Sequence, residues 1–251
     1  MTETWWQLLY DDVLADVLLE RSAEETRQTV NFLLRALELR PGQSVFDQCA
    51  GIGSLSRPLA QAGLSVVSVE QAANYVERAR SAASSEGIEL QAHVGDAFEF
   101  VAPQKCDGAF NWWTGFGYAE SDAANGRMLS RAFESLAPGA CYLLDWLNLS
   151  GVLRRFAPEV VVERETPAGP VRLVRRSRID LGAGSMIKQW IFERADGTRV
   201  ERESRVRLYL PHQLADLMRA AGFVDLQLWG DEQFGELKLD SPRTILRGRR
   251  P

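Results

Sequence analysis

The chain has 251 residues, of which 45% are hydrophobic and 25% are charged, and its formal net charge is −5. This composition suits a globular domain whose core needs neither disulfides nor a metal, and the acidic balance argues against a general nucleic-acid binder. No apolar run reaches the roughly 20 residues of a membrane span, the N-terminus shows no signal-peptide pattern and the three cysteines form no CxxC pair, so we expect a cytoplasmic protein without a membrane partner.

Residues 1–40 are predicted to form two helices. The stretch "WWQLLYDDVLADVLLER" has apolar residues at helical spacing, and the next segment opens with Ser22 and an acid three residues later, which is a capping-box pattern. A minimal α/β domain does not need the first helix. It either packs on the sheet or closes over a site as a lid, and we expect a lid.

Strands and helices then alternate up to residue 150. The predicted strands are 44–48, 65–70, 89–96, 106–113 and 140–148, and the predicted helices between them are 54–63, 72–87 and 123–139. Such alternation indicates βαβ units and a parallel sheet, which makes the fold class α/β.

Four segments in 151–210 alternate like exposed antiparallel strands, with turns such as "LGAG" and "ADGT" between them. They predict an inserted β-meander. A helix over 211–222 and two final strands, 223–230 and 241–248, follow. We therefore predict one domain over 1–251, composed of N-terminal lid helices (1–40), a cofactor-binding core (41–150), the meander (151–210) and a C-terminal helix with a closing strand pair (211–251).

The segment "VFDQCAGIGSLS" (45–56) places a run of small residues at the end of the first strand. Ligands of parallel sheets bind at the carboxyl ends of strands, and Gly51 and Gly53 allow a ligand to approach the backbone. A dinucleotide would favour GxGxxG, but Ser56 stands at the third glycine position. S-adenosylmethionine has no phosphate, and Asp47 could accept hydrogen bonds from its ammonium group, so the turn favours this cofactor. Because Cys49 is not glycine, we expect its φ to be negative.

The ends of the next strands supply the remaining cofactor contacts. Glu70 lies about 20 residues after the turn, where an acid holds a ribose diol, and Asp96 could accept the exocyclic amine of adenine. The predicted cofactor-binding residues are Asp47, Cys49, Ala50, Gly51, Gly53, Glu70, Gln71, Asp96, Ala97, Phe98, Asn111 and Trp112.

The fourth strand ends in "NWWTGFGY" (111–118), which is dense in aromatic residues. Aromatic walls of this kind predict a pocket for a flat or ring-containing metabolite. The predicted acceptor-binding residues are Tyr10, Trp113, Phe116, Tyr118, Trp146 and Asn148.

No convincing general base is evident, and the weak candidates are Tyr10, Tyr118, Asp145 and His212. The absence of a strong base favours an amine, an acidic phenol or enol, or an activated carbon as the methyl acceptor. With two histidines at no ligating spacing, we expect no metal site.

Together, "VFDQCAGIGS", "VVSVEQ", "VGDAFEF", "FNWWTGFGY" and "ESLAPGACYLLD" resemble the class I S-adenosylmethionine-dependent methyltransferases, and the ending "AAGFVDLQLWG" with "SPRTILRGR" is similar to the closing strand pair of that fold. The resemblance implies a Rossmann-like seven-stranded sheet whose last strand is antiparallel, and in-line methyl transfer to a small molecule, as in secondary metabolism. Two alternatives remain open, a nicotinamide-dependent oxidoreductase and a non-catalytic S-adenosylmethionine-binding protein. A homodimer through the meander also remains open.

Overall fold

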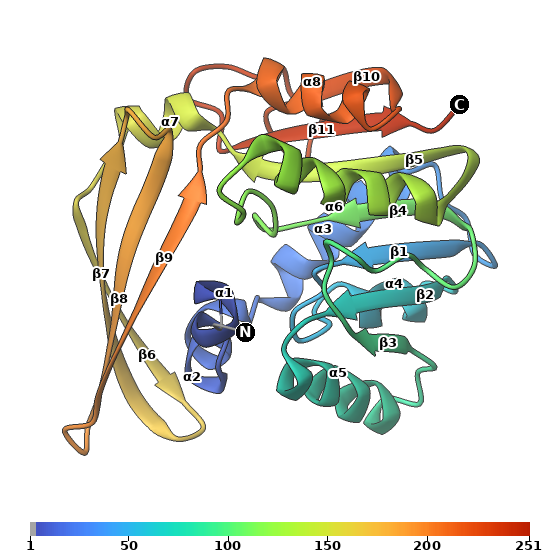
Figure 1. Cartoon of the computed structure of the whole chain (residues 1–251). Coiled ribbons are helices and arrows are strands. Elements are labelled where there is room, and N and C mark those ends of the chain that lie inside the picture. Colours follow the sequence, from blue (N-terminus) through green and yellow to red (C-terminus); the bar gives the residue numbers. More distant parts are fainter. Residues whose placement is uncertain (1–3) are drawn as a thin grey trace.

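A computed structural model describes residues 4–251, so the first three residues of the predicted N-terminal segment lie outside the described part. The larger of its two sheets has seven strands in the order β10-β11-β5-β4-β1-β2-β3 (Figure 1). Its strands are β1 (Ser44–Gln48), β2 (Ser65–Glu70), β3 (Gln91–Val94), β4 (Cys106–Asn111), β5 (Leu136–Leu147), β10 (Val224–Trp229) and β11 (Arg243–Arg249). Strands β1 to β5 pair in parallel, and β11 runs antiparallel to both β5 and β10. The predicted fold class is confirmed.

Helices cover both faces of this sheet. They are α3 (Ala23–Ala36), α4 (Ser56–Gln61), α5 (Ala73–Ser85), α6 (Asp122–Ser135) and α8 (Pro211–Ala220). On one face, α3 and α4 pack with Val45 and Phe110 of the sheet. On the other face, α6 and α8 pack with Phe46 and Tyr142. The alternating strand and helix pattern of the sequence thus gives two apolar layers that fix the carboxyl edge of the sheet.

The N-terminal region is less regular than its apolar periodicity predicts. Instead of one long first helix it forms three short pieces, α1 (Trp5–Leu9), α2 (Asp12–Leu14) and the π-helical segment η1 (Ala15–Leu19). The break occurs because the side chain of Asp11 accepts a hydrogen bond from the backbone N–H of Leu14 at 3.0 Å and starts a new helix there. We call Trp5–Leu19 the lid.

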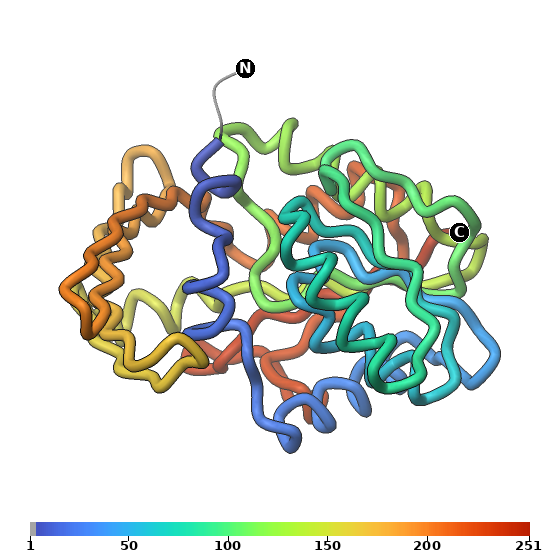
Figure 2. The backbone as a smooth tube through the Cα atoms, turned by 90° about the horizontal axis from the view of Figure 1, so that it is seen from below, coloured from blue at the N-terminus to red at the C-terminus, as the bar shows by residue number. Residues whose placement is uncertain are grey.

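The second sheet is a four-stranded antiparallel meander. It consists of β6 (Glu159–Thr166), β7 (Gly169–Asp180), β8 (Ser185–Arg194) and β9 (Arg199–Arg207), in that order. A short helix that the sequence reading did not anticipate, α7 (Leu149–Arg154), connects β5 to it. Figures 1 and 2 show the lid between the meander and the main sheet. Apolar lid side chains such as Leu9 and Leu14 pack on Leu173 and Phe192 of the meander.

Four hydrogen bonds fasten the lid backbone to its neighbours. The side chain of Arg202 on β9 donates to the carbonyl of Leu8 at 2.9 Å, and Gln71 donates to the carbonyl of Trp6 at 3.2 Å. The Tyr75 hydroxyl donates to the carbonyl of Asp11 at 2.6 Å, and the Ser54 hydroxyl donates to that of Leu19 at 3.4 Å. The lid is therefore attached to both sheets. Within residues 4–251, no helix combines the length and the apolar character that crossing a bilayer would require.

Candidate active site

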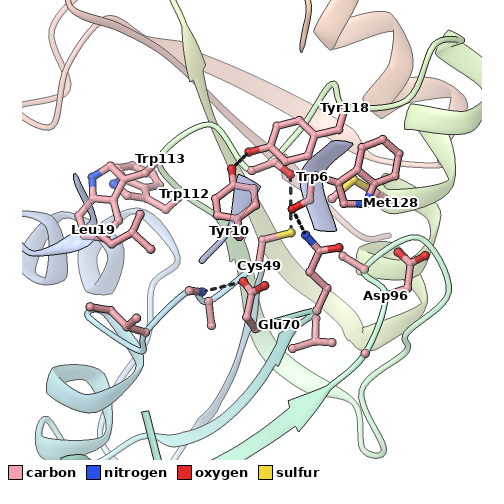
Figure 3. Close-up of a pocket in the computed structure, with 18 of the residues that line it drawn as sticks. Trp6, Tyr10, Leu19, Cys49, Glu70, Asp96, Trp112, Trp113, Tyr118 and Met128 are labelled. Carbon is pink, nitrogen blue, oxygen red and sulfur yellow. Dashed lines mark hydrogen bonds between the residues drawn. The ribbon is translucent and has the colours of Figure 1, made fainter. Parts of the chain in front are cut away.

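A cavity of about 820 Å³, including its open mouth, lies at the carboxyl edge of the main sheet. The loops after β1, β2, β3 and β4 form its floor, and the lid contributes Trp6, Tyr10 and Leu19 (Figure 3). Figure 3 shows Trp112, Trp113 and Leu19 gathered at one end and Trp6, Met128 and Asp96 at the other.

The turn after β1 enters the cavity with a left-handed backbone. The φ angles of Cys49, Gly51 and Gly53 are 68°, 56° and 76°. The expectation of a negative φ at Cys49 is therefore wrong. The backbone N–H groups of Cys49 and Ala50 both donate to the carbonyl of Val69 at 3.0 Å, and this shared acceptor fits the left-handed conformation of Cys49. Burial raises the pKa of the Cys49 thiol, which does not suit a nucleophile.

Gly51 leaves space for a ligand beside the turn. A Cβ atom built on Gly51 would meet only the Cδ1 of Leu19, 3.8 Å away across the cavity, whereas one on Gly53 would come within 2.9 Å of the Cβ of Ala79. The two glycines therefore do different things. Gly51 keeps the cavity open, and Gly53 lets α5 pack closely against the turn.

Glu70, at the end of β2, points into the cavity. Its carboxylate accepts hydrogen bonds at 3.0 Å from the backbone N–H groups of Gly51 and Ala72. Burial raises the pKa of Glu70, and these two bonds partly oppose that shift. Each oxygen retains a free lone pair, so the carboxylate is oriented to accept a pair of neighbouring hydroxyls.

Three predicted cofactor residues lie beneath the cavity rather than in its wall. Asp47 is 3% exposed and accepts a hydrogen bond from the Ser56 hydroxyl at 2.6 Å, and burial raises its pKa to about 7. Asn111 is fully buried, its amide donates toward Cys49 Sγ, and its Oδ1 has no partner among the described residues. Gly53 is also buried. These residues shape the turn from below.

The remaining predicted cofactor residues line the cavity. Asp96 is exposed, and one of its oxygens accepts the backbone N–H of Phe98 at 2.9 Å. The ring of Phe98 lies 6.1 Å from that of Trp6 on the lid. This end of the cavity thus combines an acid with aromatic walls. The structure places these predicted residues in the lining: Cys49, Ala50, Gly51, Glu70, Gln71, Asp96, Ala97, Phe98 and Trp112.

Tyr10 and Tyr118 meet across the mouth. Their hydroxyls share a hydrogen bond, and their rings stack with centroids 6.2 Å apart (Figure 3). Burial raises the pKa of both phenols. Neither is therefore suited to act as a base at neutral pH, whereas both can hold a ligand through hydrogen bonds.

Trp113 forms the opposite wall in an unusual conformation. Trp113 and Thr114 have φ angles of 56° and 69°. The guanidinium of Arg21 lies 4.9 Å from the centroid of the Trp113 ring. Asp145 and Arg243 make hydrogen bonds to the backbone of Trp113 and the hydroxyl of Thr114 respectively. Asp145 is 1% exposed and paired with Arg243, so it is not placed to act as a base.

Several predicted acceptor residues do not reach the cavity wall. Phe116 and Trp146 are fully buried and pack on each other with ring centroids 6.0 Å apart. The amide of Asn148 donates to the carbonyls of Lys238 and Ser241 at 2.9 Å. We correct the expectation for these three residues, because covering segments fill the space that they were expected to face. His212, a candidate for the general base, is exposed on α8 and does not line the cavity.

The structure adds residues that the sequence reading did not assign to the site. They are Trp6, Leu19, Ile52, Ser54, Val69, Gly95, Gly115 and Met128. The signal for Trp6 was its place one helical turn before Tyr10. No sequence signal marked Met128, which reaches the cavity from α6.

Known proteins share parts of this sequence and this structure. A protein family described as "Methyltransferase domain" matches residues 45–139, the part that supplies the turn, Glu70, Asp96 and Trp113. The CcbJ methyltransferase from Streptomyces caelestis has a similar structure, with a TM-score of 0.79 over 100% of this chain and 99% of that one at 21% identity. Residues 45–139 therefore match a methyltransferase domain, and the chain has the fold of a solved methyltransferase.

Two further structures and one curated relative are similar to this chain. The sugar N-methyltransferase KedS8 from Streptoalloteichus sp. has a TM-score of 0.71 at 16% identity, covering 93% of this chain and 89% of that one. CalS10, an amino pentose methyltransferase from Micromonospora echinaspora solved with S-adenosylmethionine, has a TM-score of 0.65 at 17% identity, covering 92% and 93%. At these identities the likeness concerns the fold.

The curated relative is a 23S rRNA (uracil(1939)-C(5))-methyltransferase RlmD of Neisseria lactamica. It is 34% identical over 70 residues, which are 28% of this chain and 16% of the relative. The chain thus matches only a small part of that relative's length.

Proposed function

We propose that this methyltransferase transfers the methyl group of S-adenosylmethionine to a nitrogen, oxygen or carbon atom of a small, ring-containing metabolite. The observation that carries the proposal is the cavity of about 820 Å³ at the carboxyl edge, with the glycine turn and Glu70 on its floor and aromatic side chains around it. A mostly apolar lining with a few polar groups at the carboxyl edge of a parallel sheet is typical of a cofactor and small-molecule site.

The residues present fit the cofactor. Glu70 is oriented to accept both ribose hydroxyls, the open space beside Gly51 admits the amino-acid part, and Asp96 with Ala97 and Phe98 suits adenine. Asp47 lies beneath the turn, so its carboxyl group would affect the bound cofactor through its charge and not through direct contact. When bound, the cofactor supplies an activated methyl group. The protein has to align the acceptor with it and exclude water.

The acceptor end of the cavity is defined by Tyr10, Tyr118 and Trp113. The two hydroxyls can bind polar groups of a ring, and the indole provides a flat apolar wall. That KedS8 and CalS10 are described as sugar and amino pentose methyltransferases supports a small acceptor. The net charge of −5 favours such an acceptor over a nucleic acid. The RlmD match spans only 70 residues and 16% of that relative, so it carries no argument about the acceptor.

Glu70 and Asp96 are assigned to the cofactor, and no other described residue of the cavity wall is suited to act as a base at neutral pH, since burial raises the pKa of both tyrosines. Asp145 lies behind the wall and is paired with Arg243. This arrangement favours an acceptor that needs little activation, such as an amine.

Calorimetric titration with S-adenosylhomocysteine and with NADH tests the donor, and tight NADH binding alone would support an oxidoreductase. Transfer of label from S-adenosylmethionine into metabolites separates an enzyme from a non-catalytic binding protein.

A further inference from the structure

A second pocket lies between the meander, α7 and the end of β5. It measures about 710 Å³ with its open mouth, and Leu147, Phe156, Val160 and Met186 provide apolar walls. We call it the meander pocket. It shares no lining residue with the cavity of the candidate active site.

Three cationic side chains line the meander pocket, and among residues 4–251 no carboxylate does. Arg175 on β7 and Lys188 on β8 are half-buried, and Arg155 is exposed at the end of α7. The guanidinium of Arg175 and the amine of Lys188 each lie 5.6 Å from the centroid of the Trp190 ring. The pocket therefore concentrates positive charge beside apolar walls.

The neighbouring arginines of the same strand are arranged differently. Arg172 pairs with Glu193 at 2.6 Å, and Arg176 pairs with Glu159 at 2.8 Å, both on the outer side of the meander. Arg175 alternates to the inner side, where no acid lines the pocket. Arginine richness alone would not produce this contrast between paired outer arginines and an inner cation without a counter-ion.

Holding Arg175 and Lys188 close together in a half-buried site is unfavourable without an anion. Burial and the nearby Arg175 lower the pKa of Lys188 to about 8, and burial also lowers the pKa of Arg175. Both groups nevertheless keep their protons at neutral pH. A dianion would offset their repulsion, and apolar walls would strengthen the attraction.

We propose that the meander pocket binds a phosphate group. Arginine recognises phosphate oxygens through a planar pair of N–H donors and lysine through a point charge, so Arg175, Lys188 and Arg155 together suit a dianionic group better than a single carboxylate. The phosphate is either an ester carried by the methyl acceptor or a free anion. The site itself does not depend on methyl transfer.

Calorimetric titration with inorganic pyrophosphate tests the site. The wild type should bind it with an affinity that falls as salt is added. Lys188→Met and Arg175→Met should each weaken binding about tenfold or more, because each removes charged hydrogen bonds. The matched control is Arg172→Met, on the outer side of β7, which should bind like the wild type. Absence of binding to the wild type, or an equal loss in Arg172→Met, would overturn the proposal.

The same variants should bind S-adenosylhomocysteine like the wild type, which shows that they are folded and separates this proposal from the proposed function. The source of the phosphate is then found by methyl labelling of a metabolite extract with and without phosphatase treatment. Loss of labelling after phosphatase, and in Lys188→Met, places the phosphate on the acceptor. Labelling that is unchanged by phosphatase and unchanged in Lys188→Met, together with pyrophosphate binding by the wild type that Lys188→Met weakens, identifies a free anion. Either result supports the site.

Discussion

The carboxylate of Asp145 accepts a hydrogen bond from the backbone N–H of Trp113 at 2.9 Å, where the backbone of Trp113 has a φ of 56°. Arg243 pairs with the same carboxylate and donates to the Thr114 hydroxyl at 2.8 Å. The left-handed conformation of two successive non-glycine residues is unfavourable, so these contacts hold Trp113 against the cavity.

We therefore expect Asp145→Ala to lower the free energy of unfolding by about 3 kcal/mol, since it leaves Arg243 without its buried partner. Denaturant unfolding measures this change. Asp216→Ala, which removes a similar pair with Arg219 on an exposed helix face, should change it by less than about 1 kcal/mol. Equal effects of the two substitutions would contradict the role given to Asp145.

Glu70→Ala should weaken the binding of S-adenosylhomocysteine by about 2 to 4 kcal/mol, because it removes charged hydrogen bonds to the ribose. The control is Glu77→Ala on α5, an exposed acid on the adjoining helix that should have no effect. Calorimetric titration of both variants checks this, and an unchanged dissociation constant for Glu70→Ala would remove Glu70 from the site.

Gly51→Val should abolish cofactor binding in a protein that still folds, since the branched side chain would occupy the space that the turn leaves open. Gly87→Val is a matched control, because Gly87 has a φ of 68° and open space around it. Both variants should lose similar stability from backbone strain. Only Gly51→Val should lose binding. Normal cofactor binding by that variant would move the site elsewhere.

Trp113→Ala should weaken acceptor binding far more than binding of S-adenosylhomocysteine, because the indole forms the wall at the end of the cavity away from Asp96. The measurement is a pair of titrations, one with each ligand, once the labelling experiment has identified an acceptor. If the cofactor alone is lost, Trp113 belongs to the cofactor site and the division of the cavity is wrong.

Asp47 should make stability depend on pH. Burial raises its pKa from 3.8 to about 7, so the folded state holds a proton that the unfolded chain releases. The contribution of this proton to the free energy of unfolding is complete below about pH 4. It is lost as pH rises to about 7, by up to about 1.4 kcal/mol per pH unit. Asp47→Asn removes this titration and keeps an acceptor for Ser56. Relative to the wild type, it should become more stable as pH increases from about 5 to about 8. Parallel unfolding profiles for the two proteins would argue against the raised pKa.

The sequence was sufficient to predict the sheet and the floor of the cavity, because these depend on local patterns. Glu70 and Asp96 could be assigned from their positions at the ends of parallel strands, since such ends meet at one edge. Trp146 could not be assigned correctly, because its burial depends on Gly117, whose added Cβ would come within 2.9 Å of the indole. Strand periodicity does not reveal which distant segment covers a side chain.

The conformation of Cys49 also depended on a distant group. The carbonyl of Val69 on the neighbouring strand accepts both N–H groups of the turn, which a single-sequence reading could not foresee. The break in the lid had a local cause at Asp11, but the strong apolar periodicity of the segment concealed it. The role of each cavity residue remains a proposal.

The attachment of the lid to both sheets has a kinetic consequence. Its backbone is bonded to Arg202 of the meander on one side and to Gln71 and Tyr75 of the core on the other, and it covers a cavity that must exchange spent cofactor for fresh cofactor in every cycle. We expect each exchange to require these attachments to break and form again. We expect this motion to be slower than the chemical step. The first turnover should then appear as a rapid burst of product, and the steady-state rate should equal the rate at which the lid opens.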